Sequence, residues 1–426
     1  MLNVLKIALR NLARFHRRTL LTSTLITLGI VAVLLFIATA GSFKGMMIGQ
    51  FTDAILGHLE IHRRGYVASI DNLPLNLNIQ PTMVGKIEDV LGKLDGVEAY
   101  SERVKFGAMF SNFTETTSVR VNGIDPQREA ATTPLMPGRI TEGSKDNLLA
   151  KSGDILIPTL LARGLKLKVG DTVVLVATNR DGSVNGRTFI VSGVMEAVSG
   201  PSGRDAYIRI DDARNLLRMT QPEVSEIAVR LKNPAKIDEM RDRLASQVGA
   251  LVGQAAAPGP AKKASGTPGG LEVHTWAALS PFSNIANMID LLTLFIKVML
   301  VSIVLISILN VMVMAVYERI REIGTIAAIG TPPQRILSLF LTEGLLLGCG
   351  GVVLGVAISL AAVYVLNVWK ITFNFGMQQG LVLSPSLSAR DVMIIAGLVV
   401  LMALLASLQP AWKASRMDPV KALGHV

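Results

Sequence analysis

The chain has 426 residues, of which 50% are hydrophobic, 17% are charged and 5% are aromatic, and its net charge is +10. The mean hydropathy of +0.46 excludes a single water-soluble core of ordinary composition. The only cysteine, Cys349, excludes an intramolecular disulfide.

Apolar residues gather in four stretches that contain no charged residue: Thr19–Phe43, Val298–Tyr317, Gly344–Trp369 and Val392–Trp412. Each stretch reaches the ~20 residues that an α-helix needs to cross the hydrocarbon core of a bilayer. The first is much longer than the apolar part of a secretory signal, so we interpret it as an uncleaved signal anchor. The sequence therefore predicts a membrane protein with four spans.

The basic residues orient these spans. Residues 1–18 are strongly basic, and the loop 318–335 and the tail 413–426 also carry a positive net charge. The long segment 44–290 is nearly neutral, with 28 basic and 27 acidic residues. Because positive residues in short loops mark the cytoplasmic side, we expect both termini inside and segment 44–290 outside. The excess charge thus orients the protein and gives no reason to expect nucleic acid as a partner.

The predicted segments follow from these patterns. They are a basic cytoplasmic N-terminus (1–18), a first span (19–43), an extracytoplasmic domain (44–290), a second span (291–317), a cytoplasmic loop (318–335), a third span (336–369), an outside loop (370–391), a fourth span (392–412) and a cytoplasmic tail (413–426).

The extracytoplasmic segment mixes helical and strand patterns. Helices are predicted at Pro81–Leu94 and Pro234–Leu251, and strands at Thr117–Ile124, Asp171–Thr178, Arg187–Val194 and Glu226–Leu231. A β-rich insert is expected at about 135–222, and a flexible linker rich in Pro, Gly and Ala at 255–270. The predicted fold is an α-helical membrane domain of four transmembrane helices plus a large α+β extracytoplasmic domain inserted between the first and second helices.

The sequence offers little enzymatic chemistry. It contains no Gly-rich phosphate loop, no G-x-S-x-G nucleophile motif and no H-E-x-x-H zinc motif. His58, Glu60 and His62 would share one face of a strand, which could suggest a metal site, but the further ligands that such a site needs are not evident. We expect no catalytic residue and no metal site in this chain.

Polar and small residues within the spans are candidates for function or for helix packing. Glu343 can pair with a neighbouring span or with an arginine of the cytoplasmic loop, whereas Ser302, Ser307 and Asn310 can form hydrogen bonds between helices. Four glycines of the third span, spaced so that helix backbones can approach closely, are expected to pack helices: Gly344, Gly348, Gly351 and Gly355.

The cytoplasmic loop is the most informative segment. Its spacing predicts a short helix over Arg321–Ile329 that ends at Gly330, because Pro332 and Pro333 prevent continuation. The apolar residues of this helix should form an exposed face that invites a partner protein: Ile323, Ile326, Ala327 and Ile329.

Several segments resemble one family. ERIREIGTIAAIG (318–330), RILSLFLTEG (335–344) and PAWKASRMDPVKAL (410–423) are similar to the FtsX-type permease module of ABC transporters, which MacB-type efflux permeases and Lol-type lipoprotein-release permeases share. The stretches before and after the first span, together with MPGRI (136–140) and residues 155–176, resemble the lipoprotein-release group.

The resemblance implies a division of labour. A separate ABC ATPase would bind ATP-Mg and hydrolyse ATP, whereas this chain would hold no cofactor and would not be an enzyme. The ATPase would dock on the loop between the second and third spans, at Glu318, Arg319, Arg321, Glu322, Ile323, Gly324, Ile326 and Gly330. The other implied partners are a second permease copy, identical or different, membrane lipid, and a periplasmic adaptor or chaperone.

The implied location is the bacterial inner membrane, with the large domain in the periplasm. The expected function is to couple ATP hydrolysis to movement of that domain, for lipoprotein release. Two alternatives stay open: efflux of hydrophobic drugs, toxins or peptides with a periplasmic adaptor, and non-transporting regulation of cell-wall hydrolases. The length of segment 44–290 favours a transporter, because the resemblance implies a much smaller outside segment for members that activate hydrolases.

Overall fold

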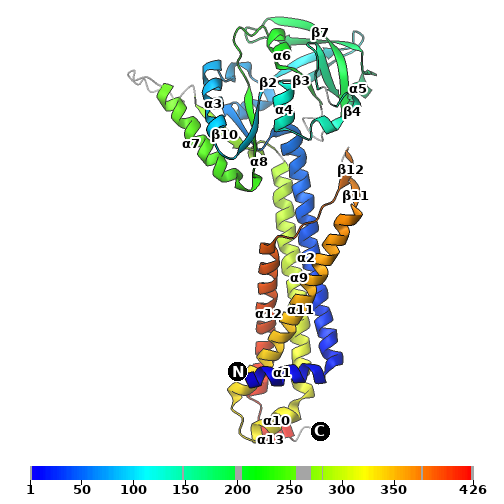
Figure 1. The fold of residues 1–426 in the computed structure, drawn as a ribbon, viewed down its shortest axis with the longest axis vertical. Helices are drawn as coiled ribbons and strands as arrows, with labels where there is room; N and C mark the ends of the chain where they lie inside the picture. The colour runs from blue at the N-terminus through cyan, green and yellow to red at the C-terminus, as the bar shows by residue number, and fades with distance from the viewer. Residues whose placement is uncertain are drawn as a thin grey trace. The chain divides into compact units, whose positions relative to one another are not determined.

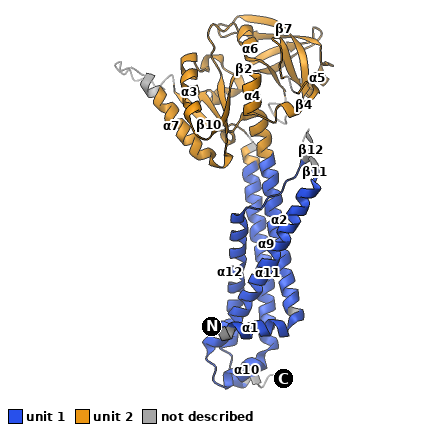
Figure 2. Ribbon diagram, in the orientation of Figure 1, with its two compact units in different colours: residues 1–46, 286–373, 382–426 blue, residues 47–285, 374–381 orange. Residues whose placement is uncertain are grey.

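A computed structural model of the protein describes residues 2–145, 148–196, 204–255, 270–280, 282–375 and 378–423. The chain divides into two compact units (Figure 2). Residues 1–46, 286–373 and 382–426 form the helical unit, and residues 47–285 and 374–381 form the α+β unit. Each unit joins segments that are distant in the sequence, because the chain leaves the helical unit after its first long helix and returns at the second.

Four long apolar helices dominate the helical unit (Figure 1). They are α2 (His16–Phe51), α9 (Phe282–Glu318), α11 (Pro333–Trp369) and α12 (Ala389–Ser415). Each contains one of the predicted uncharged stretches and is long and apolar enough to cross a membrane, so the four spans are confirmed. Helices α2 and α9 extend well beyond the uncharged stretches, because the residues next to these stretches include no helix-breaking proline inside either helix.

The shorter elements of this part of the chain are α1 (Leu2–Arg14), α10 (Ile320–Ala328), α13 (Pro419–Leu423) and a two-stranded sheet of β11 (Thr372–Phe375) and β12 (Gln378–Val382). The long helices pack through one apolar side each. Ile30 of α2, Ile308 of α9, Phe340 of α11 and Ala403 of α12 are among the buried residues of their shared core.

The α+β unit contains ten strands that are connected in one sheet. The strands are β1 (Leu59–Arg63), β2 (Val97–Ser111), β3 (Thr116–Ile124), β4 (Ile140–Gly143), β5 (Asp154–Pro158), β6 (Thr172–Thr178), β7 (Val184–Met195), β8 (Asp205–Arg209), β9 (Glu226–Leu231) and β10 (Leu271–Thr275). The helices are α3 (Pro81–Lys93), α4 (Pro126–Thr132), α5 (Thr159–Gly164), α6 (Ile210–Leu216), α7 (Ile237–Ala255) and α8 (Trp276–Leu279). The strand order is β10-β1-β9-β2-β3-β8-β5-β7-β4, and β6 pairs with β2 and β7.

The two faces of the sheet differ in chemistry around β1 and β9. Successive side chains of a strand point to opposite faces, so Leu59 and Ile61 face one side and Glu60 and His62 face the other. The apolar side joins residues of α3 and α7 in the main core of the unit. The polar side carries charged residues that are nevertheless buried.

Several predicted elements are confirmed. The helices at Pro81–Leu94 and Pro234–Leu251 correspond to α3 and α7. The strands at Asp171–Thr178 and Arg187–Val194 correspond to β6 and β7, which pair as an antiparallel hairpin. The segment 135–222 contains β4 to β8, but β3 pairs with β8 and β2 with β6. The insert therefore continues the sheet instead of forming a separate one. Most of the predicted linker 255–270 lies outside the described residues.

Candidate functional site

The loop between α9 and α11 begins with a break in the helix at Arg319. Its backbone leaves the helical region, with φ −112° and ψ 18°, so α10 starts in a new direction directly after α9. Gly330 follows the end of α10 with φ +95°, a conformation that glycine adopts without the steric penalty of a side chain. Pro333 is the first residue of α11, where its missing N–H is harmless. The predicted helix and its end at Gly330 are thus confirmed within one residue.

The side chain of Arg319 is buried and fixes the start of α10 against α11 and α1. Its guanidinium donates to both carboxylate oxygens of Glu343, at 3.0 and 3.4 Å. The Asn11 amide donates to the same carboxylate at 2.8 Å. The rings of Phe15 and Phe340 lie 5.5 and 5.7 Å from the guanidinium carbon, within the range of cation–π contacts. The predicted pairing of Glu343 is therefore made with the arginine of the loop.

A second carboxylate extends this contact toward the surface. Arg319 also donates to Glu322 at 3.0 Å, and Arg14 of α1 lies 3.7 Å from the other oxygen of Glu322. Glu322 belongs to the first turn of α10, where a negative charge is favoured by the helix dipole. The contacts link the end of α9, the start of α10 and α1 into one polar anchor, which we call the Arg319 anchor (Asn11, Arg14, Arg319, Glu322 and Glu343).

The apolar residues of α10 do not all lie on one exposed face. Ile323 is only 4% exposed and belongs to the core that the long helices share. The expectation that Ile323 forms part of the exposed face is therefore wrong, because the side of α10 that carries it turns toward the bundle. Gly324 is buried as well. In contrast, Ile326 and Ile329 are 40% and 80% exposed.

A short helix distant in sequence adds another exposed apolar residue beside α10. Helix α13 packs against α10, and its Val420 is 79% exposed. We call Ile326, Ile329 and Val420 the α10–α13 surface. Gly330, Glu318 and Arg321 are exposed on the same loop, and Glu322 is half-buried. A surface of three large apolar side chains beside charged residues is suited to bind another protein.

Sequence reasoning missed the parts that α1 and α13 contribute to this site. The pattern LNVLKIALRNLAR has apolar residues at helical spacing and could have predicted α1. Nothing in the sequence pattern indicates that Asn11 contacts Glu343, because 332 positions separate the two residues.

The four glycines expected to pack helices face two different neighbours. A Cβ on Gly344 would lie 2.6 Å from the Ser407 side chain, and one on Gly348 would lie 2.6 Å from Ala403, both on α12. A Cβ on Gly355 would lie 2.8 Å from Ile30 of α2, and Gly351 likewise lies against Ile26 of that helix. Helix α11 thus contacts α12 through its first glycine pair and α2 through its second.

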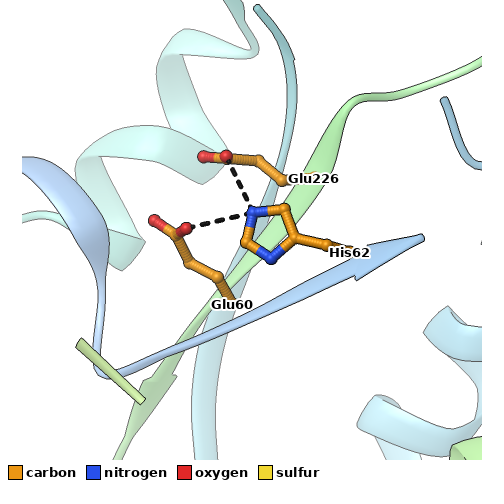
Figure 3. A group of neighbouring side chains, drawn as sticks. All are labelled: Glu60, His62 and Glu226. Carbon is orange, nitrogen blue, oxygen red and sulfur yellow. Dashed lines mark hydrogen bonds and ion pairs between the residues drawn. The ribbon is translucent and has the colours of Figure 1, made fainter. Parts of the chain in front are cut away.

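The polar face of the sheet in the α+β unit holds a second cluster of charged residues. His62 Nε2 lies 3.3 Å from a carboxylate oxygen of Glu60 and 3.3 Å from one of Glu226 (Figure 3). The strand register explains why they meet, because His62 of β1 stands directly opposite Glu226 of β9. His58 does not join them, since its ring accepts a hydrogen bond from the Leu231 N–H at 2.9 Å.

Glu60, His62 and Glu226 have the donor types of a divalent metal site and lie close enough together to bind one ion. Two cations already occupy their oxygens. Lys105 Nζ lies 2.6 Å from Glu226, and the Arg103 guanidinium lies 3.1 Å from Glu226 and 3.5 Å from Glu60. A metal ion would have to enter beside these two fixed positive charges, so electrostatics disfavours it.

The alternative is an ion cluster that balances its own charge. Arg103 also pairs with Glu129 at 2.6 Å. Burial alone would lower the pKa of His62, but hydrogen bonds to Glu226 and Glu60 outweigh it and raise this pKa to about 9. Burial would raise the pKa of Glu226, yet Lys105, His62 and Arg103 lower it below its usual range. Three cationic and three anionic side chains then compensate each other, as buried charges require.

Comparison with known proteins gives two family matches. Residues 19–247 match the MacB-like periplasmic core domain, and residues 294–419 match the FtsX-like permease C-terminal region. The second match contains α10 and the Arg319–Glu343 pair. Neither matched region is an ATPase domain.

Individual relatives are distant. The chain is similar to the lipoprotein-releasing system transmembrane protein LolC of Neisseria meningitidis serogroup B, with 22% identity over 94% of this chain and 92% of the relative. LolC of Xylella fastidiosa (strain Temecula1) is 23% identical over 72% of each chain. The macrolide export ATP-binding/permease protein MacB of Hyphomonas neptunium is 24% identical over 98% of this chain, but over only 60% of its own length. Among solved structures, the periplasmic region of MacB from Actinobacillus actinomycetemcomitans aligns with a TM-score of 0.37 and 12% identity, over 58% of this chain and 98% of that chain.

Proposed function

Because the chain belongs to the FtsX-like permeases that carry a MacB-like periplasmic core domain, we propose that it couples a separate ABC ATPase to movement of its extracytoplasmic domain. The chain is a multi-pass membrane protein with four spans and an extracytoplasmic α+β domain. It is a non-catalytic permease, and its family implies an ABC ATPase partner. In this proposal ATP-Mg is bound by that partner, and the termini and α10 lie on the cytoplasmic side of the inner membrane.

The α10–α13 surface is the observation that carries the proposal. Ile326 and Ile329 are exposed on a loop between two spans. Lipid does not cover apolar side chains outside the spans, so their exposure favours a site that a partner protein covers. Helix-in-groove contacts of this kind depend on a few anchor residues. In this proposal these two isoleucines and Val420 enter a groove of the ATPase, and Glu318, Arg321 and Glu322 contact its rim.

The Arg319 anchor supports a mechanical role for the same loop. Arg319 directly follows α9 and is bound to Glu343 of α11, so a displacement of α10 must act on both spans. A flexible loop would absorb such a displacement, whereas a buried ion pair resists separation. We infer that ATP-driven motion of the ATPase reaches the spans through this pair and moves the extracytoplasmic domain through α2 and α9.

For the substrate, we propose release of lipoproteins from the membrane. The support is the similarity to LolC over nearly the whole chain. Efflux with a periplasmic adaptor is the second candidate, supported by the similarity to MacB over 98% of this chain. ATP-dependent transfer of a radiolabelled lipoprotein from vesicles to the soluble fraction would support the first, and adaptor-dependent drug resistance without such transfer would support the second.

Replacement of both exposed isoleucines tests the docking surface. Ile326→Asp combined with Ile329→Asp would place unpaired carboxylates in the contact, which should weaken ATPase binding by on the order of a hundredfold. The measurement is co-purification of the ATPase together with transport activity. Gln334→Asp is the control, because it adds one of the two negative charges at an exposed position in the first turn of α11, outside the proposed contact. The docking proposal fails if the double variant retains its ATPase and its transport.

A further inference from the structure

A buried arginine binds the extracytoplasmic end of the first span and has no part in the docking proposal. Arg139 is only 6% exposed. Its guanidinium donates to the Ala54 carbonyl at 3.1 Å and to the Glu196 carbonyl at 2.7 Å. Within the described residues no carboxylate lies at ion-pair distance from it, and its Nε has no acceptor. Burying a cation that only backbone carbonyls bind is costly, so packing alone does not explain Arg139.

The carbonyls at the end of this span receive donors from the extracytoplasmic domain. Helix α2 runs from the helical unit into the α+β unit and is followed directly by a π-helix, η1 (Thr52–Leu56). The last carbonyls of a helix have no partner within the helix. The Asp53 carbonyl accepts from the Leu135 N–H at 2.9 Å, and the Ala54 carbonyl accepts from Arg139. The domain thus binds the helix end through its backbone.

Strand β9 holds the same helix end at a second point. The Asp53 carboxylate pairs with the Arg230 guanidinium. Gly57 follows η1 with φ +82°, and a Cβ there would lie 3.2 Å from the Val229 carbonyl oxygen, so the chain turns into β1 in close contact with β9. We call the residues that bind the end of α2 in these ways the α2 clamp (Asp53, Leu135, Arg139 and Arg230).

Arg139 connects the helix end to a different core than Arg230 does. The Arg139 carbonyl accepts from the Glu196 N–H at 2.8 Å, and Glu196 directly follows β7. Met136 and Ile140, on either side of Arg139, belong to a buried core that also includes residues of β5, β7 and β8. Arg230 extends from β9, whose apolar residues belong to the main core. The α2 clamp therefore holds both cores to one helix end.

We propose that Arg139 is a positioning residue that transmits a displacement of α2 to the part of the domain that contains β4, β5, β7 and β8. A cation is favoured at the carbonyl end of a helix by the helix dipole. The planar guanidinium holds the Ala54 and Glu196 carbonyls at once in a fixed geometry, so a movement of one carbonyl moves the other. The inference rests on the proposed function, which supplies the displacement, and it adds the residue that passes the displacement on.

Distance measurements in the assembled complex of the full chain with its ATPase test the transmission. In a Cys349→Ala background, nitroxide labels at Gly45→Cys on α2 and Leu160→Cys on α5 report the distance between the two helices by double electron–electron resonance. Both positions are exposed, and a Cβ at Gly45 would meet no atom within 4 Å. With Arg139 present, we expect the same single distance with and without ATP and vanadate. Arg139→Gln should give a distance that changes with ATP and vanadate, and transport should fall on the order of tenfold while ATP hydrolysis persists.

Arg120→Gln is the matched control, because Arg120 pairs with Asp205 at 2.8 Å in the same part of the domain and makes no contact with η1 within the described residues. This variant should keep the constant distance and native transport. Arg139→Lys separates charge from geometry. It keeps the cation, but a single ammonium replaces the two nitrogens that hold separate carbonyls, so it should uncouple as well. It also keeps the test decisive if Arg139→Gln fails to fold.

Native transport by Arg139→Gln or by Arg139→Lys would overturn the inference. So would loss of transport while the distance stays constant, because Arg139 would then act in some other way. If the chain with Arg139 intact shows no ATP-dependent transport, the proposed function fails and the inference fails with it. The two failures can therefore be distinguished.

Discussion

Removal of the positive charge from the Arg319 anchor gives the sharpest prediction for the stability of the helical unit. Arg319→Gln leaves the Glu343 carboxylate, which is 4% exposed, with the Asn11 amide as its remaining hydrogen-bond donor among the described residues. Breaking a buried ion pair on one side costs about 3–5 kcal/mol, because the remaining charge stays desolvated. Glu343→Gln should cost less, since Arg319 keeps Glu322 at 3.0 Å.

The double variant Arg319→Gln with Glu343→Gln removes both charges, and we expect it to be more stable than Arg319→Gln alone. Unfolding by SDS titration in mixed micelles measures these free energies and yields the coupling energy of the pair. Arg335→Gln is the control, because this arginine is exposed in the same loop and its loss should change stability by less than about 0.5 kcal/mol. Equal stability of Arg319→Gln and Arg335→Gln would refute the assignment of Arg319 as a buried anchor.

Two further predictions concern the buried ion cluster and the packing of α11. The pKa of His62 is about 9 in the folded protein and about 6.5 when unfolded, so its stabilising contribution of at most about 3 kcal/mol is complete below pH 6.5 and is lost as the pH rises through 9. Thermal unfolding of the full chain should therefore depend more steeply on pH between 6.5 and 9.5 than that of His62→Gln, and identical slopes would contradict the ion cluster. Gly348→Ala should destabilise the chain in detergent by about 1–3 kcal/mol, because its Cβ would meet Ala403 at 2.6 Å. Gly350→Ala, whose Cβ would meet no atom within 4 Å, should have the same stability as the native chain or higher, and a cost equal to that of Gly348→Ala would exclude close packing as the cause.

The parts of the fold that depend on local sequence could be predicted. Uncharged stretches of 20 residues or more define the four spans, and the positive φ of Gly330 explains why the sequence signals the end of α10 so clearly. The burial of Ile323 could not be predicted in this way. Ile323 and Ile326 are three residues apart on one helix, and the spacing alone does not say which of them faces the bundle.

Contacts between distant segments account for the rest. Glu60 and His62 are visible as a pair in the sequence, but Glu226 joins them only through the register of β1 and β9, 164 positions away from His62. A shift of that register by one residue would turn Glu226 to the opposite face of the sheet. The contact of Asn11 with Glu343 likewise depends on the direction of α1, which Phe15 separates from α2.

Photo-cross-linking from two exposed apolar positions tests the central claim, that the α10–α13 surface docks the ATPase. A photoreactive residue at Ile329, which is 80% exposed, should capture the ATPase in cells. The same residue at Phe113, which is 66% exposed in the extracytoplasmic domain, should capture none. An ATPase adduct at Phe113, or none at Ile329 in a complex that still hydrolyses ATP and transports, would contradict the account.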